Sequence, residues 1–198
     1  MKNNKFILFL ILSVFLGGCE QPLKYRFQDK PQKVDCPGAD KALMHEALYS
    51  FQEDIAKYYN KYSDYREGTP SYYIEGYMQF VYRGLEGTAP FKEIVSQHSL
   101  DLLQKLKENK SLWDFEKSGA HLNYDNEYVN CLLTSIKDDA FREKLQILRD
   151  ENYFSPQIIA EPMRQNVMMI IQDEYLAMFL MLDGYYQHLL DFDFTNTP

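Results

Sequence analysis

The chain has 198 residues, of which 45% are hydrophobic, so it is long enough for one domain with a substantial core and too short for two comfortable ones. Its 29 acidic residues outnumber its 21 basic residues and give a formal net charge of −8 at pH 7. An acidic surface argues against nucleic-acid binding and against a basic patch that docks on anionic lipid.

The first nineteen residues carry the most specific motif of the sequence. Lys2 and Lys5 precede an apolar run over residues 6–16, which is too short to span a hydrocarbon core. The run ends in LGGC at 16–19, which resembles the lipobox of bacterial lipoproteins. The resemblance implies that residues 1–18 are a removed signal peptide and that Cys19 carries a diacylglycerol. The alternative is an ordinary signal peptide with a coincidental cysteine.

Acylation of Cys19 would make the membrane itself a partner of the protein, because two or more acyl chains hold a protein to a bilayer stably. The mature chain would have 180 residues and a charge of about −10, since Lys2 and Lys5 leave with the signal peptide. The residue that follows Cys19 is Glu20. An aspartate at this position would resemble an inner-membrane retention signal. We therefore favour the outer membrane, with the domain in the periplasm or on the cell surface.

Residues 19–35 are expected to form a lipidated tether, and residues 36–198 a single helical domain. The tether has two prolines, mixed charges and no sustained hydrophobic period. Its basic residues lie either near the membrane surface or in a solvated linker: Lys24, Arg26, Lys30 and Lys33.

Two cysteines remain once Cys19 is acylated. Cys36 and Cys131 would lie in an oxidising compartment, where a disulfide between them is favoured over two separate buried thiols or one reactive cysteine. Neither cysteine belongs to a C-x-x-C motif, so redox catalysis and haem attachment have no support.

The first predicted helix begins after Gly38, with Asp40 as its cap, and ends near Ser63. Its apolar stripe excludes the charged residues Glu46 and Asp54. The stripe comprises Met44, Leu48, Phe51, Ile55, Tyr58 and Tyr62.

A second helix is predicted over residues 71–86, and it is rich in aromatic residues. Gly76 and Gly84 lie eight residues apart on nearly the same face, where they either permit a close helix approach or weaken the helix. A third helix is predicted over residues 89–108. His98 lies on its stripe and is expected to be a satisfied boundary histidine rather than a ligand. Residues 109–126 are irregular and form a candidate functional loop.

The next predicted helix starts near Asp125 and either continues through residues 137–139 or breaks there. The run Val167–Leu182 is apolar nearly all round and is expected to be a buried central helix. It is not expected to cross the membrane, because Asp173 and Glu174 near its middle would be costly in lipid. The predicted fold class is all-α, a single-domain bundle of five or six helices.

Catalytic and metal-binding motifs are absent from the sequence. There is no Gly-x-Ser-x-Gly, and HEALY at 45–49 lacks the second histidine of a zinc peptidase. No Glu-x-x-His pair, phosphate loop or dinucleotide turn occurs either. We therefore predict no catalytic residues, no metal and no cofactor. Asp173 and Glu174 are the remaining polar feature. One of them is either a general acid or, preferably, paired with a basic residue such as Arg164 or Arg142, or facing water.

The sequence favours a non-catalytic, lipid-anchored binding or scaffold module for a protein or glycan partner. Its sixteen tyrosines suit either the margins of a helical core or an aromatic binding patch. The candidate patch comprises Tyr72, Tyr73, Tyr77, Tyr82 and Trp113. The alternatives are a carbohydrate-active hydrolase that uses carboxylates such as Asp173 and Glu174, and an immunity-type inhibitor of a basic toxin.

Overall fold

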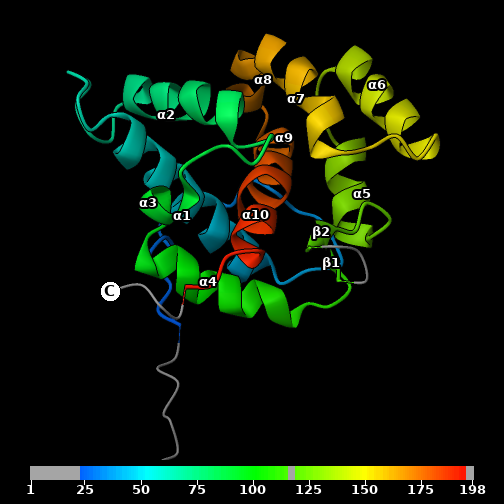
Figure 1. Ribbon diagram of the computed structural model, residues 1–198, viewed down its shortest axis with the longest axis horizontal. Helices are drawn as coiled ribbons and strands as arrows, with labels where there is room; N and C mark the ends of the chain where they lie inside the picture. The colour runs from blue at the N-terminus through cyan, green and yellow to red at the C-terminus, as the bar shows by residue number, and fades with distance from the viewer. Residues whose placement is uncertain (1–22, 116–118, 195–198) are drawn as a thin grey trace, which may run out of the picture.

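A computed structural model describes residues 23–115 and 119–194, so the predicted signal peptide and Cys19 lie outside the described residues. The described chain is a single bundle of helices with one small antiparallel hairpin, which confirms the all-α prediction (Figure 1). In the hairpin, β1 (Trp113–Asp114) pairs with β2 (His121–Leu122), with Asp114 opposite His121. Among the described residues, no helix is both long and apolar enough to span a bilayer.

The helices are more numerous and shorter than predicted. In chain order they are α1 (Lys41–Tyr59), α2 (Pro70–Arg83), α3 (Phe91–Ile94), α4 (Gln97–Glu108), α5 (Glu127–Thr134), α6 (Asp139–Asp150), α7 (Pro156–Gln165), α8 (Val167–Gln172), α9 (Glu174–Leu180), the π-helix η1 (Met181–Tyr186) and α10 (Gln187–Leu190).

Helices α1 and α2 pack closely along their length. Asp40 caps α1 as predicted, accepting hydrogen bonds from the backbone N–H groups of residues 42 and 43. A Cβ atom at Gly76 would lie 2.7 Å from the Cα of Ala56, so only glycine permits this approach. Gly84 does not serve the same purpose, because the ring of Phe80 covers it. Helix α1 ends at Tyr59, four residues before the predicted end.

Two predicted helices are broken, and each break follows from a capping side chain. The predicted helix over 89–108 divides at Val95, where the backbone is extended and Ser96 caps α4 through a hydrogen bond from Ser99 N. The predicted helix Val167–Leu182 divides at Asp173, whose carboxylate accepts hydrogen bonds from the backbone N–H groups of residues 175 and 176. The predicted central position holds for its second half, since α9 is buried apart from its first turn.

The helix predicted from residue 125 breaks before residues 137–139 and does not continue through them, which is the second of the two predicted alternatives. Helix α5 ends at Thr134, and Asp138 caps α6 by accepting a hydrogen bond from Phe141 N. From α9 onward the chain does not turn at Asp183-Gly184, but continues as η1 and α10.

The segment expected to be a tether packs on α1 instead. Phe27 and Val34 are buried in it, so the packed region extends upstream of the boundary expected at residue 36. Glu46, predicted to lie off the apolar stripe, is fully buried beneath this segment. Its carboxylate accepts hydrogen bonds from the backbone N–H groups of Arg26 and Phe27 and lies 2.7 Å from His98 Nε2. We call this arrangement the Glu46 clasp.

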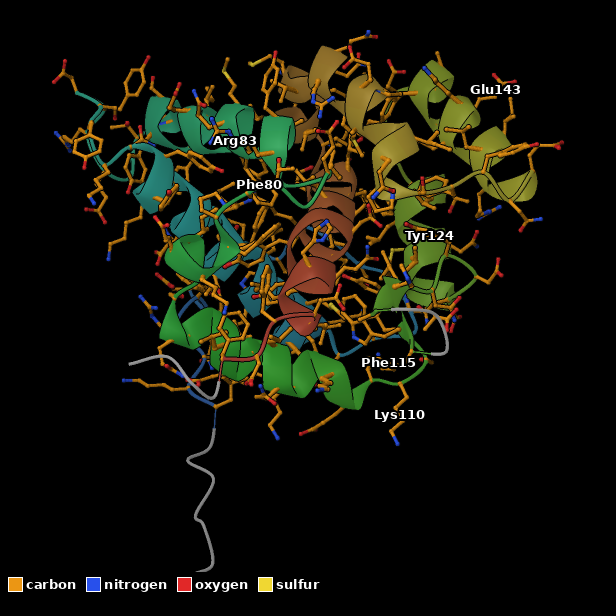
Figure 2. All side chains as sticks on the ribbon, viewed as in Figure 1. Phe80, Arg83, Lys110, Phe115, Tyr124 and Glu143 are labelled. Carbon is orange, nitrogen blue, oxygen red and sulfur yellow. A yellow bond between two sulfur atoms is a disulfide. The ribbon has the colours of Figure 1, made fainter. Side chains whose placement is uncertain are left out.

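A cluster of aromatic rings joins α1 and α2 to the C-terminal helices. The ring of Phe51 lies 5.1 Å from those of both Phe80 and Tyr185. Figure 2 shows Phe80 inside the molecule, with α6 and Glu143 at its outer edge. Asp54 is buried beside these rings and accepts hydrogen bonds from Tyr185 Oη and Ser96 N. Burial raises the pKa of the Asp54 carboxyl, and these hydrogen bonds oppose that effect.

Candidate functional site

The structure does not bring the five predicted aromatic residues together on one exposed surface. The exposed fractions of Tyr72, Tyr77 and Trp113 are only 8%, 3% and 3%. Trp113 donates a hydrogen bond to the carbonyl of residue 106, and the hydroxyl of Tyr77 accepts one from residue 52. Tyr73 is half-buried. Of these five residues, only Tyr82 is largely exposed, with an exposed fraction of 58%. Three of the five side chains therefore belong to the core: Tyr72 and Tyr77 because α2 packs on α1, and Trp113 because it is buried in β1.

The predicted disulfide is present between Cys36 and Cys131. It joins the end of the N-terminal segment to α5, across 95 residues of sequence. The predicted lipid attachment at Cys19 lies outside the described residues.

Asp173 and Glu174 do not form a catalytic pair. Asp173 is buried as the cap of α9 and also accepts a hydrogen bond from Lys137 N. Glu174 pairs with a basic residue, as expected, but that residue is Lys137, whose Nζ lies 2.6 Å from the Glu174 carboxylate, and not Arg164 or Arg142. Burial favours the neutral form of Glu174, but its hydrogen bonds and the charges of Lys137 and Lys33 together outweigh burial and hold the pKa below its usual value.

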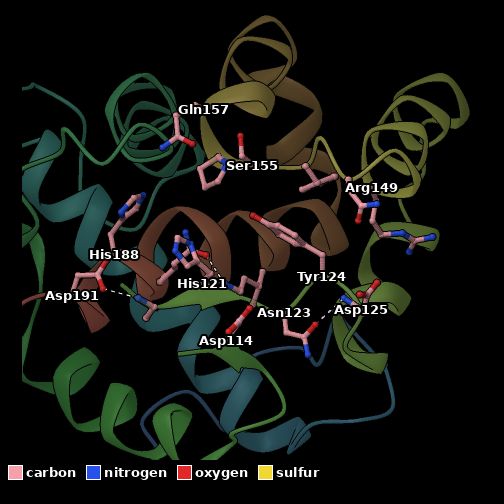
Figure 3. A pocket seen from close by; sticks show the side chains of 16 residues that line it. Asp114, His121, Asn123, Tyr124, Asp125, Arg149, Ser155, Gln157, His188 and Asp191 are labelled. Carbon is pink, nitrogen blue, oxygen red and sulfur yellow. Dashed lines mark hydrogen bonds between the residues drawn. The ribbon is translucent and has the colours of Figure 1, made fainter. Parts of the chain in front are cut away.

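The best candidate site is a pocket between the hairpin, the α6–α7 connection and the C-terminal helix (Figure 3). Its volume of about 570 Å³ lies within the usual range for small-molecule sites. Seven of the eighteen residues of the predicted functional loop line it. The lining residues are Asp114, Ala120, His121, Leu122, Asn123, Tyr124, Asp125, Arg149, Asn152, Phe154, Ser155, Pro156, Gln157, Gln187, His188 and Asp191.

Two stacked aromatic rings lie at the base of this pocket, and a buried carboxyl group lies behind one of them. The ring of Tyr124 stacks at 4.6 Å on Phe154, and its hydroxyl donates a 2.7 Å hydrogen bond to Asp183 Oδ1. Asp183 is fully buried in η1, and its Oδ2 has no hydrogen-bond partner among the described residues. Burial raises the pKa of the Asp183 carboxyl to about 7, although the hydrogen bond from Tyr124 opposes this. Tyr124 thus stands between the buried carboxyl and the pocket.

The C-terminal helix fixes the hairpin that forms one wall. Gln187 Oε1 accepts a 2.6 Å hydrogen bond from Leu122 N, and Asp191 Oδ1 accepts a 2.8 Å hydrogen bond from Ala120 N. His188 lies between these two residues, and burial lowers the pKa of its imidazole.

The charges around the pocket do not favour an anion. Arg149 is already hydrogen-bonded to Asn130 and Asp150. Three aspartates line the pocket, at positions 114, 125 and 191. Because the one lining arginine is compensated, the pocket suits a neutral ligand that is rich in hydrogen-bonding groups.

The reactive side chains in and behind the pocket already have structural partners. No group of three histidine, cysteine or acidic side chains suited to a metal occurs in the part of the chain that the structure describes. The hydroxyl of Ser155 lines the pocket and is of the type that serves as a nucleophile in enzymes. Here it caps α7 and accepts a hydrogen bond from Ile158 N. Asp183, the group whose pKa suits a general acid, is shielded by Tyr124.

Sequence reasoning missed the polar wall that the C-terminal helix provides. Asp183, Gln187 and Asp191 recur at intervals of four residues, which is a helical spacing that could have identified them. The helix predicted from sequence ends at Leu182, so this spacing was not considered. In the structure η1 continues the helix through Gly184 and keeps these residues on the side of the hairpin.

Comparisons with known proteins add no relative: no family model matches the chain, and neither a curated protein nor a solved structure does.

Proposed function

We propose that the protein is a lipid-anchored, non-catalytic binding module of the periplasm or cell surface, and that a glycan is its ligand. The observation that carries the proposal is the pocket walled by the hairpin and α10, with the aromatic pair Tyr124–Phe154 at its base. Sugars offer many hydroxyl groups and apolar ring faces, and such a pocket meets both. The anchor rests on the lipobox-like sequence that ends at Cys19.

Binding is favoured over hydrolysis by the position of the acidic groups. A glycosidase needs two carboxyl groups that face each other across the scissile bond. The carboxyl with a pKa of about 7, that of Asp183, is hydrogen-bonded behind Tyr124. Asp191 is engaged by the backbone of Ala120 and serves to hold the hairpin.

The experiment is a capture assay with the tagged mature protein, using a panel of cell-wall fragments and surface oligosaccharides as the probe. We expect capture of a glycan without its cleavage. His121→Ala should reduce capture at least tenfold, because His121 lines the pocket without holding the fold through a side-chain hydrogen bond among the described residues.

Tyr82→Ala is the matched control, since Tyr82 is the most exposed residue of the aromatic patch predicted from sequence. Loss of capture in Tyr82→Ala with full capture in His121→Ala would refute the pocket. Turnover of the wall fragments would refute the non-catalytic assignment. Unchanged membrane retention of Cys19→Ala would refute the lipid anchor.

A further inference from the structure

The N-terminal segment carries a local excess of positive charge that the net charge of −8 conceals. Residues 24–33 contain four basic side chains and one acidic side chain, Asp29, and all five are exposed. We call this segment the basic strip. Its basic side chains are Lys24, Arg26, Lys30 and Lys33.

The strip is held rigidly against the helical bundle. Its chain starts extended, with Leu23, Tyr25 and Phe27 turned inward while the residues between them are exposed. The Glu46 clasp binds its backbone at residues 26 and 27. Farther along, Tyr49 Oη donates a 3.1 Å hydrogen bond to the carbonyl of Pro31.

The outward side chains of the strip are largely available. Lys24 and Lys30 form no ion pair with any described residue. Arg26 lies 3.5 Å from Glu53, and Lys33 lies 3.9 Å from Glu174, in pairs that are partly exposed and therefore weak. The strip thus presents positive charge to whatever lies outside it.

The distance to the lipid attachment point is short. Cys19 precedes Lys24 by five residues, which span at most about 18 Å in any conformation. A chain anchored at Cys19 therefore keeps the start of the strip within about 18 Å of its lipid.

We propose that the basic strip is the membrane-facing surface of the domain and that it lies on the anionic head groups of the bilayer that holds Cys19. This inference rests on the proposed lipid anchor and adds an orientation to it. It also revises the expectation, drawn from the net charge alone, that no basic patch docks on anionic lipid. The head groups supply the negative charge that the strip lacks, and each lysine near such a surface strengthens the attraction about fivefold. The domain is then seated on the membrane in one orientation rather than swinging on a free tether.

The test uses the mature chain from Cys19 with its disulfide intact, which leaves Cys19 as the single free thiol. Cys19 is coupled to a maleimide phospholipid in vesicles of phosphatidylglycerol and phosphatidylethanolamine, or of phosphatidylcholine alone. Lysines are then acetylated, and each site is quantified by mass spectrometry. On the anionic vesicles we expect Lys24 and Lys30 to react at least fivefold more slowly than in the uncoupled chain. Lys144, exposed on α6, should react at an unchanged rate.

Charge reversal supplies the matched comparison. Lys24→Glu with Lys30→Glu should abolish the protection of Lys33, whereas Lys57→Glu with Lys144→Glu should preserve it. Equal reactivity of Lys24 and Lys30 with and without anionic vesicles would overturn the inference, as would equal protection of Lys144. Because the coupling is chemical, this outcome is independent of whether cells acylate Cys19.

Discussion

Glu46 and Asp183 are both fully buried carboxylates, and the two regions built around them differ in how completely their oxygens are hydrogen-bonded. Glu46 receives two backbone N–H groups and lies beside His98, so the Glu46 clasp is a satisfied structural unit. Asp183 receives one hydroxyl from Tyr124, and its second oxygen has no partner in the described chain. The comparison indicates that Glu46 stabilises the fold of the N-terminal region. At the base of the pocket, by contrast, the unpartnered oxygen of Asp183 lowers the stability of the folded protein.

Removing the disulfide is the most severe way to weaken the N-terminal region. Cys36→Ser with Cys131→Ser should lower the free energy of unfolding by about 4 kcal/mol, because the bridge closes a long loop in the unfolded chain. Urea unfolding of the double variant measures this loss, and reductant should reproduce it in the wild type. A loss below about 1 kcal/mol would show that the clasp holds the segment by itself.

Glu46→Gln tests the satisfied carboxylate directly. It should lower the free energy of unfolding by about 3 kcal/mol, since an amide nitrogen would face backbone donors that now meet a carboxylate. Glu53→Gln is the control, because Glu53 is half-exposed and should change stability by less than about 0.5 kcal/mol. Similar losses in both variants would contradict the special status of Glu46.

Asp183→Asn should act in the opposite direction. The Asp183 carboxyl has its usual pKa of 3.8 in the unfolded chain and a pKa of about 7 in the folded protein. Between these two values the folded protein holds a proton that the unfolded chain has already released. The free energy of unfolding therefore falls as pH rises from 3.8 to about 7. The variant should lack this decline and be more stable than the wild type by about 2 kcal/mol at pH 8. Urea unfolding at pH 4, 6 and 8 provides the measurement. Parallel pH profiles would rule out the predicted shift.

Tyr124→Phe should have the smallest effect, a loss of about 1 kcal/mol that grows as pH rises, because the ionised Asp183 then has no donor. Tyr82→Phe, at an exposed position, should leave stability unchanged. Thermal unfolding at pH 5 and pH 8 distinguishes the two variants. An equal loss of stability in Tyr124→Phe at pH 5 and pH 8 would show that the effect of Tyr124 does not depend on the ionisation of Asp183.

Local patterns in the sequence predicted the helical class, the Asp40 cap and the pairing of Cys36 with Cys131, and offered a close helix approach at Gly76 as one of two alternatives. These features depend on nearby residues or on simple counting. The helix breaks at Ser96 and Asp173 were missed because a capping side chain competes with an uninterrupted apolar period.

The candidate site was harder to predict than the fold. Residues of the loop at 109–126, predicted only to be a candidate functional loop, line the pocket, but the opposite wall comes from Gln187 and Asp191, some 70 residues away. The predicted aromatic patch assumed that tyrosines on one helix are exposed together, whereas Tyr72 and Tyr77 serve the core. Burial of Glu46 depended on Phe27, in a segment whose composition resembles a linker.

The hydrogen bond between Asp54 and Tyr185 joins residues 131 apart, and the bonds that hold the hairpin reach almost to the end of the described chain. These contacts fix the order in which the molecule can be completed as it is synthesised. Helices α1 and α2 can pair early, because they are neighbours in sequence. The pocket must wait for residues 187–191 to dock, so its wall forms only after the helices that precede it have been synthesised.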